Sequence, residues 1–314
     1  HSCLNNYYNI EDSSIRFYFP YIEYFSQEDN LIDYDSRFNN TCSLIDIMDN
    51  VKIFDENNTK YMGVINKTNH EFSAEVVIKR IPILNFENVM LLKKHLKKQE
   101  KQLLMPSQPL VPFGKLSSFY NSTYIETMVS YITSKLTEEN ICPHYSLFYG
   151  YCIFNEGETI YNITDDIDKL DGYSWFSENE TEEFYTKYGY DILYKDNLED
   201  KEPDKNTDED EENNSEDESF ESVDIQTYAV VNHSPVQLKF SEYCGEDSIN
   251  GRIHFTEKEW ESILFQVMYT LYVGWSYFQL THNDLHLGNI LFKPTTHEYI
   301  YYNVAGKYYK IRTY

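Results

Sequence analysis

The side chains best suited to chemistry lie in one short polar stretch near the end of the sequence. Residues 280–292 read LTHNDLHLGNILF and bring His282, Asp284, His286 and Asn289 close together in the chain. Carboxylates, imidazoles and amides of this kind accept protons, form hydrogen bonds and bind metal ions. An apolar stretch precedes them and another follows, so the pattern predicts a polar loop between a buried helix and a short strand.

The spacing resembles the catalytic loop of protein kinases, in which an Asp is followed five residues later by an Asn. The resemblance implies that Asp284 is the catalytic base, that Asn289 is a magnesium ligand and that His282 braces the loop. Phosphoryl transfer requires such a pair, because the carboxylate orients the acceptor hydroxyl while the amide oxygen holds a metal ion that bridges the phosphates.

The loop departs from the common protein-kinase form at two positions. Asn283 stands where Arg is usual, and His286 stands where Lys is usual. The resulting Asp-x-His resembles haspin-type protein kinases and also aminoglycoside and choline kinases, which phosphorylate small molecules. His286 then either contacts the transferred phosphoryl group in place of Lys or packs within the loop. The missing Arg argues against switching by activation-loop phosphorylation.

The order of the flanking motifs is similar to that of haspin and of related kinases of large DNA viruses. The resemblance is firm over residues 235–314 and loose over residues 74–154. Residues 299–310 stand where this family has a hairpin, and its second metal-binding Asp comes shortly afterwards. The sequence ends at Tyr314, before that Asp, so we expect this chain alone to be poorly soluble and inactive.

The resemblance also implies where ATP binds. Residues 77–79 are similar to the lysine strand of the kinase small lobe, which makes Lys79 the candidate for gripping the α- and β-phosphates. An ordinary surface lysine at a strand edge is the alternative. The partner of Lys79 would be a Glu on the following helix, and Glu126 fits best, with Glu138 or Glu139 as substitutes.

The turn that covers the nucleotide departs most from the family. Kinases place a glycine-rich turn before the lysine strand so that backbone amides can approach the phosphates. Gly63 is the one glycine in the first 110 residues. We expect either another turn, near residues 57–59 or 66–67, to do this work, or a pseudokinase with weakened nucleotide binding. The resemblance adds Glu242 and Cys244 as further contacts of the nucleotide.

Local patterns predict the elements that must position these residues. Strand patterns cover residues 75–83, 146–154 and 235–240, and the last alternates as a strand with one buried face does. Helical periodicity covers residues 85–104 and 123–137, the latter with a buried apolar stripe from Ile125 to Leu136. A capping box at Thr256 and Glu259 opens an apolar helix that runs to about Phe278.

Composition excludes several classes of protein. Lys and Arg total 26 against 52 for Asp and Glu, and a net charge of −26 excludes a general nucleic-acid coat. A hydrophobic share of 41% excludes general disorder. Five cysteines without a C-x-x-C pair predict reduced thiols rather than a zinc site. The uncharged residues 262–280 approach a membrane-spanning length, but their polar members and acidic flank favour a buried helix.

Charge is unevenly distributed along the chain. Residues 196–224 contain fifteen acidic residues and two lysines, half of the net charge, and predict a solvated loop. This loop is either a docking tail for basic partners with phosphorylation targets at Ser215 or Ser219, or a tolerated surface insertion. The lysines of residues 93–101 form the one basic patch worth naming, either a solvated helix face or a contact for an acidic partner or nucleic acid.

The local patterns predict the α+β class, and the resemblance to protein kinases implies a bilobal protein-kinase-like fold. An N-terminal extension would cover residues 1–45, and an antiparallel small lobe residues 46–243 with an acidic disordered insertion at about 156–230. Residues 244–314 would begin a mainly helical large lobe that is cut before the activation segment.

The predicted function is transfer of the γ-phosphoryl group of ATP, with Mg²⁺, to a Ser or Thr hydroxyl of a protein, basic proteins included. The alternatives are a pseudokinase or interaction protein, and a small-molecule kinase of the aminoglycoside or choline type. No membrane or nucleic-acid partner is expected. The sequence starts at His1 without a secretory signal, which predicts a cytoplasmic protein. Its thirty tyrosines are compatible with an AT-rich viral genome, and a viral protein could also occupy the host nucleus or the virion.

Overall fold

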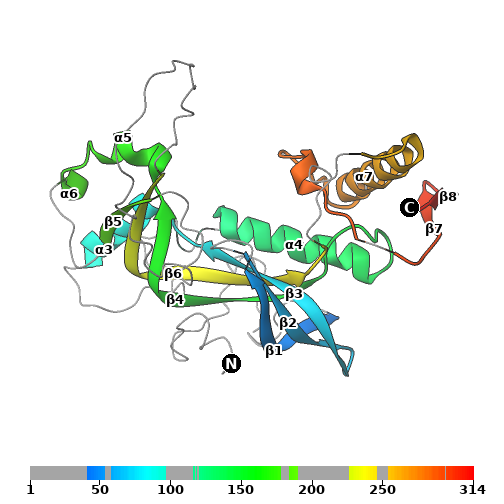
Figure 1. Ribbon diagram of the computed structural model, residues 1–314, viewed down its shortest axis with the longest axis horizontal. Helices are drawn as coiled ribbons and strands as arrows, with labels where there is room; N and C mark the ends of the chain where they lie inside the picture. The colour runs from blue at the N-terminus through cyan, green and yellow to red at the C-terminus, as the bar shows by residue number, and fades with distance from the viewer. Residues whose placement is uncertain are drawn as a thin grey trace, which may run out of the picture.

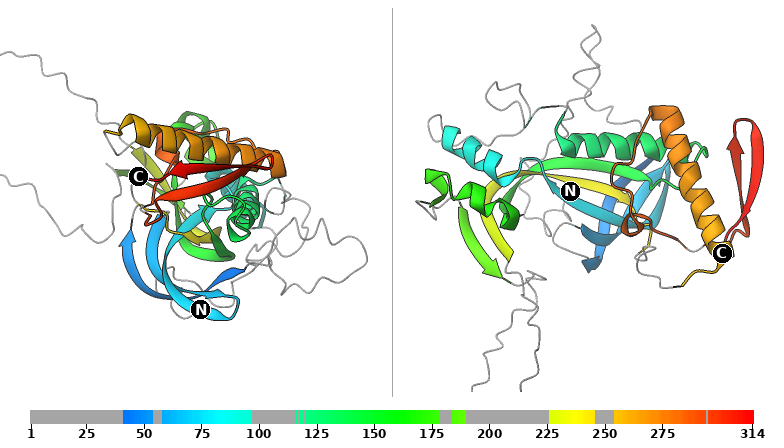
Figure 2. Two further views of the ribbon diagram at one scale, coloured as in Figure 1. Left: turned by 90° about the vertical axis from the view of Figure 1, so that its right-hand side faces the viewer. Right: turned by 90° about the horizontal axis from the view of Figure 1, so that it is seen from above.

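The computed structural model describes residues 41–53, 58–96, 116, 118, 120–177, 184–189, 226–245, 254–293 and 295–314. These residues form a mixed α and β structure in which a long helix lies along an antiparallel sheet (Figure 1). A second helix and a hairpin lie at one end of that sheet (Figure 2).

The main sheet has six strands, and all of its pairings are antiparallel. The strands are β1 (Cys42–Ile53), β2 (Asn58–Lys67), β3 (His70–Pro82), β4 (Phe148–Asn162), β5 (Phe184–Gly189) and β6 (Gln226–Glu242). Their order is β1-β2-β3-β6-β4, and β5 pairs with the first part of β6. The three strands predicted from sequence are confirmed as parts of β3, β4 and β6, although β4 begins two residues later than predicted.

Two long helices carry the rest of the architecture, together with several short ones. The helices are α3 (Phe86–Leu96), α4 (Ser122–Glu138), η2 (Thr164–Asp166), α5 (Ile167–Leu170), α6 (Ser174–Ser177), α7 (Glu257–Phe278) and η4 (Leu287–Asn289). The capping box of Thr256 and Glu259 is present at the start of α7, as predicted. The predicted helix over residues 85–104 is confirmed as far as Leu96, and its remainder lies outside the described residues.

Three apolar clusters hold these elements together. One joins α3, α4 and α5 to one face of the sheet around Phe86, Tyr124 and Ile153. A second fills the opposite face of the sheet. The third packs the end of α4 and the loop after it against α7 and the hairpin formed by β7 (Tyr299–Val304) and β8 (Lys307–Arg312). The hairpin predicted from sequence is thereby confirmed.

The buried face of α4 differs from the predicted apolar stripe. Ile125 is 40% exposed, whereas Thr127 and Ser134 are buried. The prediction was wrong at Ile125. The buried face also includes the two polar residues, which the prediction did not name, and both of their hydroxyls have partners. Thr127 donates to the carbonyl of Thr123 and accepts from the Gln237 side chain, and Ser134 accepts from the backbone amide of Phe148. Polar residues can be buried at little cost when their hydrogen bonds are made.

The boundaries of the predicted domains also change. Strand β1 begins at Cys42, so the expected extension over residues 1–45 overlaps the sheet. Within the expected insertion at about 156–230, the described residues form the end of β4, η2, α5, α6, β5 and the start of β6. The acidic residues 196–224 themselves lie outside the described residues.

The expectations for the cysteines and for a membrane-spanning helix can be compared with the described residues. The four cysteines among them are free thiols: Cys42, Cys142, Cys152 and Cys244. Of the helices that the structure describes, none is both long and apolar enough to cross a membrane. The expectation of a buried helix over residues 262–280 was wrong, because α7 packs on one side only, against the loop after α4 and the hairpin. Its buried residues are Ser262, Tyr269, Val273 and Gly274, whereas Leu264, Met268 and Trp275 are more than half exposed. On the packed side, the Tyr145 hydroxyl donates to the carbonyl of Thr270 at 2.8 Å.

Candidate functional site

Lys79 and Glu126 form an ion pair between the sheet and helix α4. The Nζ of Lys79 lies 2.8 Å from Oε1 of Glu126. Side chains alternate along a strand, so Lys79 points to the face opposite to that of the buried Ile78. Helix α4 covers that face, and its Asn121 cap and Thr123 hydroxyl tie its first turn to the end of β3. The position of Glu126 is therefore set both by its ion pair with Lys79 and by the attachment of the first turn of α4 to the end of β3.

A second lysine contacts the same carboxylate. Lys239 lies directly across from Lys79 in the β3–β6 register, and its Nζ is 2.5 Å from Oε1 of Glu126. It also contacts the Ser130 hydroxyl at 3.2 Å. Burial by itself would raise the pKa of Glu126, but the charge and hydrogen bonds of Lys239 and Lys79 hold that pKa below its ordinary value. Burial lowers the pKa of Lys239 despite this partner.

The sequence pattern did not indicate Lys239 as a site residue. The alternation over residues 235–240 predicted one buried face, with Gln237 and Lys239 on the solvent side. That prediction was wrong, since every residue from 235 to 240 is buried. The face expected to meet water instead meets α4, where Gln237 reaches Thr127 and Lys239 reaches Glu126.

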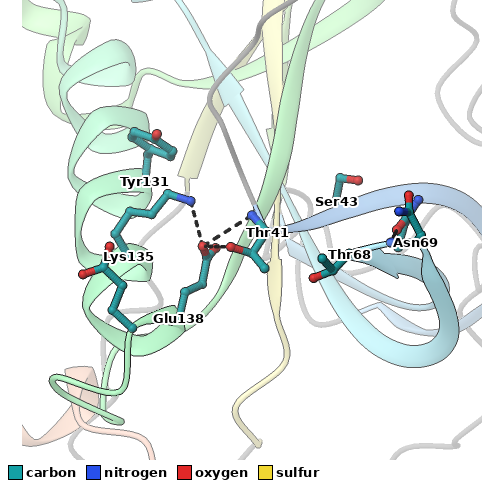
Figure 3. Close-up of a pocket in the computed structure, with 9 residues that line it drawn as sticks. Thr41, Ser43, Thr68, Asn69, Tyr131, Lys135 and Glu138 are labelled. Carbon is teal, nitrogen blue, oxygen red and sulfur yellow. Dashed lines mark hydrogen bonds and ion pairs between the residues drawn. The ribbon is translucent and has the colours of Figure 1, made fainter.

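The two substitutes considered for Glu126 lie elsewhere. Glu138 accepts from Lys135 and from the Thr41 hydroxyl, each at 2.7 Å, and Glu139 is exposed at the end of α4. Glu138 lines a polar cavity of about 680 Å³ (Figure 3). The start of β1, the β2–β3 turn and the second half of α4 form its walls, through Thr41, Ser43, Asn66, Thr68, Asn69, Tyr131, Lys135, Glu138 and Glu139.

The polar loop after α7 is organised by its own side chains. The Nδ2 of Asn289 donates to the backbone carbonyl of Asp284 at 2.8 Å and lies 3.4 Å from its carboxylate. The Nδ1 of His286 accepts from the backbone amide of Gly288 at 3.2 Å and so caps η4. All three of Asp284, His286 and Asn289 are exposed, as is His282. The loop thus brings together three of its four predicted site residues.

The segment after β6 lies against the end of this loop. Glu242 accepts from Lys293 at 2.8 Å and from the backbone amide of Leu147 at 3.2 Å. Gly245 has a φ of +107°, and a Cβ atom there would lie 3.0 Å from the carbonyl oxygen of Phe292. A residue with a side chain would be strained at this position. Glu242 and Cys244 therefore lie beside the end of the polar loop. The short strand predicted there was wrong, because Leu291 alone forms a β-bridge and no strand is described between η4 and β7.

Cys244 itself has an inert thiol. Burial, reinforced by the nearby Glu242, raises the pKa of Cys244 to about 11. The thiol consequently stays protonated near neutral pH, and it lies 3.7 Å from the carbonyl oxygen of Glu242. Thiolate chemistry at this position is not favoured.

The sheet register distinguishes the two turns considered for covering a nucleotide. Asn58, the first residue of β2, pairs with Lys79. Asn66 and Lys67 pair with Glu71 and His70 at the opposite end of the ladder. The connection between β1 and β2 therefore joins the sheet beside Lys79, although residues 54–57 of that turn lie outside the described residues.

Comparisons with known proteins give one short similarity. The chain is 40% identical over 55 residues to a protein of Dictyostelium discoideum named as a probable serine/threonine-protein kinase. This match covers 17% of the chain and 4% of that protein. No protein-family model matches the chain.

Proposed function

We propose that this chain is part of an ATP-dependent protein kinase that transfers the γ-phosphoryl group to a Ser or Thr hydroxyl. The observation that carries the proposal is the ion pair of Lys79 with Glu126. It joins a sheet strand to a helix 47 residues further along the chain. A protein kinase uses a lysine held by a glutamate in this way to grip the phosphates of ATP. The short similarity to a probable kinase supports the same function.

Lys79 is accessible enough to bind a phosphate. Its side chain is 40% exposed even in its ion pair with Glu126. An ammonium group on a flexible stem can turn toward an anion that arrives from solvent. The β1–β2 connection, which joins the sheet beside Lys79, would then cover the phosphates.

The polar loop would supply the chemistry of transfer. Asp284 is exposed, and Asn289 restrains its carboxylate through the hydrogen bond to the Asp284 backbone. In this proposal Asp284 orients the acceptor hydroxyl and accepts its proton. In a neutral His286 ring, Nδ1 accepts from Gly288, so the proton resides on Nε2. That N–H can donate to the transferred phosphoryl group while Nδ1 maintains the loop, so His286 would serve both roles considered from sequence.

The donor set of the loop fits magnesium. Asn289 uses its Nδ2 in the loop, which leaves its amide oxygen free to be a ligand atom, and the Asp284 carboxylate lies 3.4 Å from that Nδ2. Among the described residues there is no cluster of three or more His, Cys, Asp or Glu side chains that could hold a metal ion. Magnesium commonly takes one or two protein oxygens, and phosphates and water complete its shell. When bound, Mg²⁺ would neutralise charge that develops on the phosphates.

The segment from Glu242 to Gly245 would hold the base of the nucleotide. The Glu242 side chain is engaged by Lys293 and Leu147, and the Cys244 thiol is protonated. Contacts with an adenine would therefore use the backbone groups of this segment. Within protein kinases, the Asp-x-His sequence supports a haspin-like or viral subgroup, and the excess of acidic residues supports basic protein substrates.

The test of this function is phosphoryl transfer by the purified full-length protein, with Mg²⁺ and labelled ATP. A mixture of basic and acidic proteins should become labelled on Ser or Thr, while an aminoglycoside and choline should not. Lys79→Met should abolish the labelling. Lys169→Met is the matched control, because Lys169 on α5 is exposed and pairs with Glu87 on α3, away from the candidate site. Labelling of the small molecules alone would replace this proposal with a small-molecule kinase, and no ATP binding would indicate a pseudokinase.

A further inference from the structure

We propose that Lys239 is a positioning residue that holds Glu126, and with it helix α4, while Lys79 binds the phosphates of the nucleotide. This inference rests on the proposed kinase function and assigns a role to a residue of the same site. Its starting point is that both ammonium groups contact one oxygen atom, Oε1 of Glu126.

The two lysines differ in how they are buried. The side chain of Lys239 is 11% exposed, against 40% for Lys79. Lys239 also contacts the Ser130 hydroxyl, and that hydroxyl donates to the backbone carbonyl of Glu126. If Lys239 lost its contact with Glu126, its buried ammonium group would have no anion beside it, which is strongly unfavourable. Lys79 can exchange its partner for water or an anion at far lower cost.

The charges of this cluster allow the two lysines to have different roles. Two cations and one anion leave a net positive charge where the nucleotide phosphates would bind. With a single lysine, the carboxylate and the phosphates would compete for one ammonium group. With Lys239 in place, Glu126 keeps a buried partner when Lys79 turns to a phosphate. The helix then stays fixed in both states of Lys79.

The register of β3 with β6 and the position of α4 make this arrangement possible. Lys79 and Lys239 are direct neighbours across the β3–β6 ladder, so both side chains leave the same face of the sheet. Like charges opposite one another destabilise a sheet unless an anion lies between them. Glu126 supplies that anion from α4. Substitution of any one of these three residues therefore changes the electrostatic environment of the other two.

The test uses Mg²⁺-ATP affinity, measured by calorimetry at a temperature at which every variant is folded. In Lys239→Met, Lys79 becomes the remaining cation for Glu126, so ATP should bind roughly tenfold more weakly. In the double variant with Lys239→Met and Glu126→Gln, the neutral amide releases Lys79. The ATP affinity should then return to within about threefold of the wild-type value. Lys239→Arg, which keeps the charge, should bind ATP better than Lys239→Met.

A matched control lies on the same helix. Lys135 pairs with Glu138 at 2.7 Å near the end of α4, and Figure 3 shows this pair at the polar cavity. Lys135→Met should leave the ATP affinity unchanged. A purely structural Lys239 would lower the melting temperature without moving the ATP affinity of the folded protein.

The outcomes separate this role from the proposed function. If the wild-type protein binds Mg²⁺-ATP but the double variant binds it no better than Lys239→Met, the role of Lys239 is overturned and the kinase proposal stands. If the wild-type protein does not bind Mg²⁺-ATP, the proposed function is overturned, and the role of Lys239 with it.

Discussion

At Asp284, contacts from a neighbouring side chain restrict a group that is otherwise exposed to solvent. The Nδ2 of Asn289 lies 2.8 Å from the Asp284 carbonyl and 3.4 Å from its carboxylate. A catalytic base must be held in a productive orientation before the substrate arrives. In the proposed function, the loop would supply this orientation through two residues that lie five apart in the sequence, so sequence spacing alone could indicate it.

Asp284→Asn should reduce phosphoryl transfer by a factor of about 10² to 10⁴ while ATP affinity stays near the wild-type value. An Asn keeps a side-chain oxygen near Asn289, so the loop survives while the base is lost. Turnover and ATP affinity measured on the same preparation separate the two effects. Asp165→Asn, at an exposed site in η2, should leave both values unchanged. Wild-type turnover in Asp284→Asn would remove the assignment of Asp284 as base.

At the scale of elements, local sequence patterns identified α3, α4, α7 and three of the six strands of the main sheet. They missed β1, β2 and β5, and they did not indicate the contacts between the faces of the elements. The capping box of Thr256 and the apolar run after it predicted α7 correctly, because these signals act within one or two turns. The buried face of α4 and the burial of Lys239 were missed. Periodicity records which side chains share a face, but it cannot say whether water or another element covers that face. Lys239 is identified as a site residue only once α4 is placed over β6.

Thr256→Ala should destabilise the protein by about 1 kcal/mol, because helix α7 loses the hydroxyl that accepts from the Glu259 amide. Chemical denaturation would measure the change in free energy of unfolding. Thr256→Ser keeps a capping hydroxyl and should be nearly neutral. Equal stability of the Ala and Ser variants would show that the capping box contributes nothing to this helix.

The hairpin is attached through a half-buried histidine. The Nε2 of His144, in the loop after α4, lies 2.9 Å from the Tyr302 hydroxyl on β7, and the two rings stack. Burial lowers the pKa of His144 to about 4. The folded protein therefore holds this ring neutral at a pH at which the unfolded chain would protonate it.

This pairing predicts a pH dependence of stability between about pH 6.5 and pH 4. The pKa of His144 is lower in the folded state than its ordinary value of 6.5, so the unfolded state binds the extra proton in this window. Stability should fall with decreasing pH, by up to about 1.4 kcal/mol per pH unit. His144→Gln should remove this component, as measured by denaturation across the window. His297→Gln, at an exposed site, is the control and should retain it.

At the scale of the whole molecule, the candidate site draws on both parts of the structure. Lys79 and Glu126 belong to the sheet and α4, whereas Asp284 and Asn289 follow α7. The third apolar cluster, the Lys293–Glu242 ion pair and the approach of Gly245 to Phe292 hold these parts together. None of these contacts is visible in sequence, since each joins segments far apart in the chain. Among the described residues, no hydrogen bond or ion pair joins Lys79 or Glu126 to Asp284 or Asn289, so their joint action on a nucleotide belongs to the proposal.

The acidic residues 196–224 can be tested as a separable part of the molecule. Gly189 at the end of β5 pairs with Gln226 at the start of β6, so the sheet already holds together the two ends of the connection that contains them. Deletion of residues 199–221 shortens a connection whose closure free energy depends weakly on length. We expect cooperative unfolding and a melting temperature within about 4 °C of the wild-type value.

The same deletion distinguishes the two functions considered for this segment. If the acidic residues dock basic partners, the deletion should raise the KM for a basic protein substrate and leave that for an acidic one unchanged, because it removes attractive charge without touching the candidate site. High salt screens the same attraction, so it should also raise the KM of the wild-type protein for the basic substrate. If the segment is a tolerated insertion, both KM values should stay constant. A large loss of stability would contradict both expectations, since it would mean that these residues pack against the fold.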